Sequence, residues 1–145
     1  MIRRDDNPVV SLVSLAISPF IMIFALYVVF HGHYSPGGGF QGGTMLAASV
    51  LLIRLASGSE LGHLQFRKTW GTPLGSAGVL IYFGTGFIAM LWGGNYLNYH
   101  HLPLGLHPDM LRSWGILIVE VGVALAVMGI LVAIYDDLLE GELND

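Results

Sequence analysis

The sequence predicts an all-α membrane protein in which four transmembrane helices are joined by short connections. Composition is the first reason: 54% of the residues are hydrophobic and 11% are charged, whereas a soluble domain carries about 25% charged residues. The second reason is four long apolar runs, each close to the roughly 20 residues that cross a bilayer. The third is glycine, which supplies 20 of 145 residues and is frequent where membrane helices pack closely.

Charge and cysteine content exclude several classes of protein. The net charge is -4 and the isoelectric point is about 5.8, which argues against a nucleic-acid partner. The chain has no cysteine, so it has neither a disulfide nor a thiolate metal site. Gly37, Gly39 and Gly42 match a dinucleotide-binding spacing, but an apolar run precedes them where that motif requires a strand. We therefore expect no cofactor and no enzymatic activity.

The first predicted span covers residues 9–30, which contain no charged residue. It is longer than the apolar region of a secretory signal peptide, so we expect it to be retained. Ser11, Ser14 and Ser18 share one face of this helix, where we expect their hydroxyls mostly to bond their own backbone. Pro19 lies inside the helix and predicts a kink.

The second predicted span covers about residues 36–55, and its start is ambiguous. Ser35 can cap a helix whose first residue is Pro36, and a helix from Ser35 to Leu55 would be about 31 Å long. A helix that begins only at Phe40 would measure about 24 Å. Irregular glycine-rich backbone would then lie at membrane depth, where it must be buried in protein or line water.

The third and fourth spans cover about residues 74–92 and 113–135. The third is uncharged, and Glu120 alone interrupts the fourth. The remaining connections are short and the tail, residues 136–145, is acidic and polar. We therefore expect residues 1–145 to form a single four-helix membrane domain.

Basic residues predict the orientation in the membrane. The N-terminus and the connection between the second and third spans carry most of them, whereas Arg112 lies on the opposite side. Because cytoplasmic loops are enriched in Lys and Arg, both termini are predicted to be cytoplasmic. The basic residues on the cytoplasmic side are Arg3, Arg4, Arg54, Arg67 and Lys68.

The connection between the first two spans has the most unusual composition. Its glycines predict a close approach of the backbone to another segment, and Phe40 is a candidate wedge or plug as the large side chain among them. A simple tight helix start and a role in lining an ion route both remain open. The candidates for an ion route or for subunit packing are His33, Pro36, Gly37, Gly38, Gly39, Phe40, Gln41 and, in the fourth span, Glu120.

The fourth span predicts two different helix faces. Gly115, Gly122 and Gly129 are spaced by seven residues and, with Ala126 and Ala133, predict a seam of small residues for helix packing. Glu120 points roughly 200° away from Gly122 at about 100° per residue. A carboxylate in a membrane helix normally faces protein or water, so the helix should be enclosed on two sides. Four helices barely supply that enclosure, which implies partner subunits.

Histidines in the connection between residues 93 and 112 offer a metal site only in principle. His100, His101 and His107 could bind zinc with Asp109, but their spacing does not specify a ligand geometry. We expect no metal, and we expect this connection to lie on the membrane surface or against a partner.

At the glycine-rich connection the sequence resembles a known family. Gly32, His33 and the run Ser35–Gly43, which follow an apolar helix, resemble the MnhB-like family of Mrp-type multisubunit sodium/proton antiporters. The resemblance covers nearly the whole chain, including Asp6, Asn7 and Pro8. It implies a small subunit of a complex in the plasma membrane that exchanges Na⁺ for H⁺. Its partners would include large antiporter subunits that resemble those of respiratory complex I.

Two alternatives to this function remain open. The equivalent subunit of an Mrp-related membrane-bound hydrogenase or dehydrogenase is hardly distinguishable from sequence. An independent small homo-oligomeric channel would need a polar stripe along one whole helix, and none is visible. Whether the chain itself conducts ions is not determined by the sequence.

Overall fold

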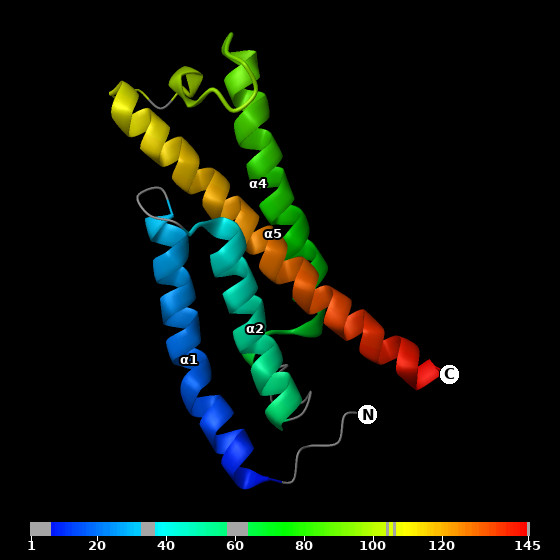
Figure 1. Ribbon diagram of the computed structural model, residues 1–145. Coiled ribbons are helices and arrows are strands. Elements are labelled where there is room, and N and C mark those ends of the chain that lie inside the picture. Colours follow the sequence, from blue (N-terminus) through cyan, green and yellow to red (C-terminus); the bar gives the residue numbers. More distant parts are fainter. Residues whose placement is uncertain (1–6, 33–36, 58–63, 104, 106, 145) are drawn as a thin grey trace.

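The computed structural model describes residues 7–32, 37–57, 64–103, 105 and 107–144. Within these residues all regular structure is helical, and four helices are long and apolar enough to cross a membrane, which confirms the predicted fold class. The long helices are α1 (Pro8–His31), α2 (Gly39–Ser57), α4 (Gly71–Leu91) and α5 (Pro108–Asn144), with the short 3-10 helices η1 (Lys68–Trp70) and η2 (Tyr99–His101) (Figure 1).

The helix ends follow local chemistry. Asn7 caps α1, because its side chain accepts a hydrogen bond of 3.1 Å from the backbone N–H of Val9, and Pro8 occupies the first turn. Helix α2 begins at Gly39, later than the Pro36 start, which favours the shorter of the two alternatives. Ser35 and Pro36 themselves lie outside the described residues. Helix α5 extends well beyond 113–135 at both ends and takes in much of the acidic tail.

Helix α5 is the centre of the arrangement. It crosses the molecule diagonally, with α4 on one side and α2 on the other, while α1 packs against α2 (Figure 1). The main apolar core lies where α1, α2 and α5 meet. It consists of Ala25, Leu46, Ala47, Val50, Met128 and Val132.

The interface of α5 with α4 is built from small residues on both helices. A Cβ added to Gly129 would lie 2.9 Å from the Cα of Gly75, and one added to Gly78 would lie 2.9 Å from the Cα of Ala126. Both distances are shorter than side-chain atoms tolerate, so backbone packs directly on backbone. Gly122 and Ala133 contact α4 in the same way. Gly115 lies apart from this interface and packs against the ring of Tyr99.

The serines of α1 bond to α2, and the expectation that they bond their own helix is wrong for two of them. The hydroxyls of Ser11 and Ser57 are 2.8 Å apart, and Ser18 donates a bond of 3.1 Å to the carbonyl of Ser49. A hydroxyl that reaches a neighbouring helix in an apolar environment links the two helices. Serine therefore contributes to the α1–α2 interface.

Candidate functional site

The buried carboxylate of the fourth span meets the glycine-rich connection. Glycines 32, 38 and 39 surround Glu120, and we call these three residues the glycine cradle. A Cβ added to Gly32 would lie 2.6 Å from Oε1 of Glu120, and one added to Gly38 would lie 3.2 Å from the same oxygen. At Gly39 an added Cβ would lie 2.8 Å from the carbonyl carbon of Glu120. The space that side chains would need at these positions is therefore occupied by Glu120.

The backbone of the cradle also requires glycine. Gly38 has φ +130°, a conformation that L-residues rarely adopt. Its carbonyl accepts a hydrogen bond of 3.0 Å from the N–H of Gly42, so the first turn of α2 starts here. The N-terminus of a helix carries partial positive charge, which stabilises a nearby carboxylate. Glu120 thus lies at the end of α2 where a negative charge is favoured, and its Oε2 is buried.

Glycines further along α2 extend the contact in two directions. A Cβ added to Gly43 would lie 2.6 Å from the carbonyl oxygen of Ala124 on α5, whereas one added to Gly42 would lie 2.9 Å from the carbonyl oxygen of Ala25 on α1. Gly39 and Gly43 therefore face α5 on the same side of α2, as expected for residues four apart. The first turns of α2 therefore lie between α1 and α5, which leave no room for side chains at Gly42 and Gly43.

The other candidates of the connection lie away from Glu120. Phe40 is 65% exposed, so its ring does not fill the interior of this chain, and its role as a wedge or plug against another segment stays a prediction. Its exposure follows from its position beside Gly39, whose face is already in contact with α5. Gln41 is also exposed, and Gly37 approaches Val28 instead. His33 and Pro36 lie outside the described residues.

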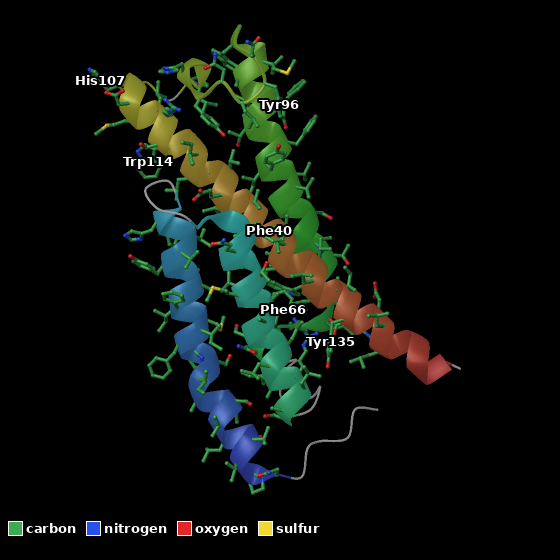
Figure 2. The ribbon with its side chains drawn as sticks, in the orientation of Figure 1. Phe40, Phe66, Tyr96, His107, Trp114 and Tyr135 are labelled. Carbon is green, nitrogen blue, oxygen red and sulfur yellow. The ribbon has the colours of Figure 1, made fainter. Side chains whose placement is uncertain are left out.

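Phe40 contributes to an apolar groove on the surface between α2 and α5. The groove has a volume of about 430 Å³ and is lined entirely by apolar surface. Figure 2 shows Phe40 at the start of α2, beside the crossing of α2 with α5. Its remaining lining residues are Thr44, Ala126, Val127, Ile130 and Leu131. The hydroxyl of Thr44 donates to the carbonyl of Phe40, which leaves its methyl group for the groove.

The two faces of α5 contact two helices of the same chain. Gly122 and Ala126 lie against α4, while Glu120 and Ala124 lie against the cradle and α2. Helix α5 lies between α2 and α4 and packs against both (Figure 1). The enclosure that was expected from partner subunits is therefore supplied at these positions by the chain itself, and Glu120 makes its contacts inside the chain.

A second polar site lies at the other end of α2 and was missed in the sequence. Arg54 is 1% exposed and Asp136 is 5% exposed, and the two form an ion pair. Arg54 also donates a hydrogen bond of 2.8 Å to the carbonyl of Phe66. From the sequence, Arg54 was expected among the cytoplasmic basic residues and Asp136 in a polar tail. Opposite charges at the ends of two apolar spans were the available signal, because a charge in this environment needs a partner.

An apolar layer separates the ion pair from Glu120 within the described residues. From Gly39 to Arg54, α2 rises about 22 Å at about 1.5 Å per residue. Leu46 and Ala47 lie between these points and are buried in the main core. The buried Ser49, to which Ser18 donates a hydrogen bond, follows them on the side of Arg54. Among the residues that the structure describes, the histidines and acidic residues form no group of three that could hold a metal.

Comparison with known proteins identifies similar membrane proteins. Residues 9–133 match the family described as "Domain related to MnhB subunit of Na+/H+ antiporter". The chain is 32% identical over 117 residues to the Na(+)/H(+) antiporter B subunit of Alkalihalophilus pseudofirmus, covering 74% of this chain and 80% of that protein. It is 26% identical over 144 residues to the protein of the same name in Bacillus subtilis, covering 97% and 98%.

A solved structure has the same fold. It is described as the membrane-bound sulfane sulfur reductase, an archaeal respiratory membrane complex, and a polypeptide in it superposes with a TM-score of 0.72 at 26% identity. The match covers 96% of this chain but spans only 60% of the length of that one.

Proposed function

This chain belongs to the family of domains related to the MnhB subunit of Na⁺/H⁺ antiporters, and we propose from this membership that it is a small integral subunit of a multisubunit monovalent cation/proton antiporter complex. The match to residues 9–133 carries the proposal, because it includes all four candidate spans at least in large part. Two relatives named as the corresponding antiporter subunit match 74% and 97% of this chain. The complex would lie in the plasma membrane with both termini of this subunit in the cytoplasm.

The outer surface of the helices fits a subunit embedded in lipid and in contact with other subunits. Large apolar side chains on α1 and α4, such as Phe20, Leu12 and Leu80, are 69–74% exposed. An isolated soluble chain would not leave so much apolar surface uncovered. The large complex-I-like antiporter subunits are the partners that we propose for part of this surface.

Within the complex, the role that we assign to this chain is structural rather than catalytic. The polar groups around Glu120 and around Arg54 are separated by the buried apolar residues of α2. A protein that carried ions by itself would need a continuous polar route across the bilayer. We therefore propose that the chain braces its neighbours and that exchange needs the other subunits.

Glu120 is proposed to act as a junction between the glycine cradle and α5. Its backbone and side chain both lie against the cradle, so one residue fixes the end of α1, the start of α2 and the first half of α5. A residue that relays protons would have to change its hydrogen bonds in each cycle, whereas the close backbone contacts here favour a fixed arrangement. Lining of an ion route by the cradle in the assembled complex is the competing interpretation.

Two measurements test the proposed function. The tagged chain, extracted in mild detergent, should bring down large antiporter subunits. The purified chain alone, reconstituted in liposomes, should give no Na⁺-dependent pH change, whereas the purified complex should. Exchange by the chain alone would overturn the assignment as an accessory subunit.

A second candidate function is a subunit of a respiratory membrane complex. The similarity to a polypeptide of the sulfane sulfur reductase complex favours it, since that match covers 96% of this chain. The extraction experiment separates the two candidates. Redox subunits in the extracted complex would support the respiratory assignment, and their absence beside antiporter subunits would support the first.

A further inference from the structure

A second pocket, lined by both polar and apolar residues, lies at the end of the molecule opposite the start of α1. It has a volume of about 280 Å³ and is formed where the α4–α5 connection folds over the first turns of α5. Six residues line it: Leu97, Asn98, Tyr99, His100, Arg112 and Ile116. None of them belongs to the candidate site described above.

The connection is held in a defined shape at this pocket. Leu97 has φ +61°, a left-handed conformation that is unfavourable for a leucine. The turn that follows is closed by a hydrogen bond of 2.9 Å from the N–H of Asn98 to the carbonyl of Asn95. The ring of Tyr99 lies against Gly115, where an added Cβ would be 2.7 Å from its Cγ. The glycine therefore allows the pocket wall to sit directly on α5.

The charge of the pocket favours an anion. Arg112 places a guanidinium group in the wall, and within the described residues it makes no ion pair. Asn98 and His100 add side chains that can donate hydrogen bonds. Two acidic residues lie near the pocket without lining it: Asp109, one turn earlier on α5, and Glu120, whose charge contributes to the raised pKa of Tyr99. Arg112 also lies near the N-terminus of α5, whose dipole favours negative charge.

Aromatic side chains at this end of the molecule are of the types that prefer the depth of lipid headgroups. Trp114 and Trp92 are 53% and 55% exposed, and Tyr96 is 41% exposed. Figure 2 shows Tyr96 and Trp114 at the same end of the molecule as His107, which precedes α5. Tryptophan and tyrosine prefer the membrane–water interface. Ile116 and Leu97 supply an apolar side to the pocket, so a ligand with an anionic head and an apolar tail fits both parts.

We propose that this pocket binds the phosphate group of an anionic phospholipid, with Arg112 as the main contact. Guanidinium binds phosphate with two parallel hydrogen bonds, and Asn98 and His100 complete the binding of the phosphate oxygens. The acyl chains extend along Ile116 into the bilayer. The same phosphate chemistry would suit free inorganic phosphate, but the depth set by the aromatic residues favours the lipid.

Native mass spectrometry of the protein extracted from its membrane, with the subunits that remain bound, tests the proposal. The wild-type protein and the variants Arg112→Gln and Arg112→Lys are delipidated and then titrated with phosphatidylglycerol. Arg112→Gln should weaken binding of one phosphatidylglycerol per chain by about tenfold or more, because it removes a charged hydrogen-bond donor. Arg112→Lys should lose less affinity for phosphatidylglycerol than Arg112→Gln, since lysine keeps the positive charge but not the planar guanidinium group that binds phosphate with two hydrogen bonds.

Arg67→Gln is the matched control, because Arg67 is an exposed arginine in the other connection, on the far side of the membrane spans. It should leave this binding unchanged. Inorganic phosphate is added as a competitor, and it should displace the lipid weakly. Equal phosphatidylglycerol binding by wild type and Arg112→Gln would overturn the proposal. Strong displacement by inorganic phosphate would assign the pocket to a free anion, and loss of a bound subunit without loss of lipid would assign Arg112 to a protein partner.

Discussion

Gly39→Ala tests the close contact between α2 and α5 most directly. An added Cβ at this position would lie 2.8 Å from the carbonyl carbon of Glu120 and nearer still to its oxygen. The obstacle is backbone, which cannot rotate away as a flexible side chain can. To raise even the 2.8 Å distance to the 3.4 Å at which ordinary contact begins, α2 and α5 must separate by at least about 0.6 Å, and the nearer oxygen requires more.

The expected cost follows from two opposing terms. Inserting a methyl group into a packed interface costs about 1–3 kcal/mol. Replacing glycine by alanine within a helix gains about 0.5–1 kcal/mol, and less at Gly39, which is the first residue of α2. We expect a net loss of about 1–2 kcal/mol in the free energy of unfolding, which lowers the folded-to-unfolded ratio by a factor of roughly 5–30.

The assay is thermal stability of the detergent-solubilised protein, read as the fraction that elutes as a single species after heating. Gly84→Ala is the matched control, because Gly84 lies within α4 and an added Cβ there has no atom within 4 Å. Gly84→Ala should be as stable as wild type or slightly more stable, while Gly39→Ala should lose stability. Equal melting of the two variants would refute the close α2–α5 contact at the cradle.

Three further predictions concern the polar groups. If Glu120 is a fixed junction, Glu120→Gln should preserve subunit co-purification and Na⁺/H⁺ exchange, whereas Glu120→Leu should weaken co-purification. Loss of exchange in an intact complex that carries Glu120→Gln would instead indicate that Glu120 relays protons. Arg54→Leu should destabilise the protein by about 3–5 kcal/mol, because it leaves Asp136 buried and unpaired. In the thermal assay, the double variant with Asp136→Leu should regain most of this stability. A double variant no more stable than the single one would contradict the pairing. Burial, and then Tyr82, Glu120 and Tyr96, raise the pKa of Tyr99 above its usual 10.0. The folded state therefore favours the neutral hydroxyl, and the stability this contributes is present below pH 10 and lost as pH rises through the folded pKa. Tyr99→Phe should reduce the alkaline loss of stability measured by thermal melting, and an unchanged pH profile would exclude this contribution.

The comparison of sequence with structure is most instructive at Glu120. The residue spacing of a single helix determines that Glu120 and Gly122 lie on different faces, because every residue turns the helix by about 100°. It does not determine which segment each face meets. Gly39 is about eighty positions away in the chain, and its contact with Glu120 depends on how α5 crosses α2. The unusual glycine run and the lone carboxylate were visible separately, and only the fold placed them together.

The sequence by itself determined the four spans, because hydropathy over about 20 residues reflects the local requirement for crossing a bilayer. It also indicated the small-residue stripe of α5, since regular spacing on one helix is a local property. The tertiary structure alone decided that Arg54 and Asp136 pair, that Phe40 faces outward and that Ser18 bonds to α2. Each of these depends on a neighbour distant in sequence. Burial requires that a charge or hydroxyl find a partner, but the choice of partner is made when the helices pack.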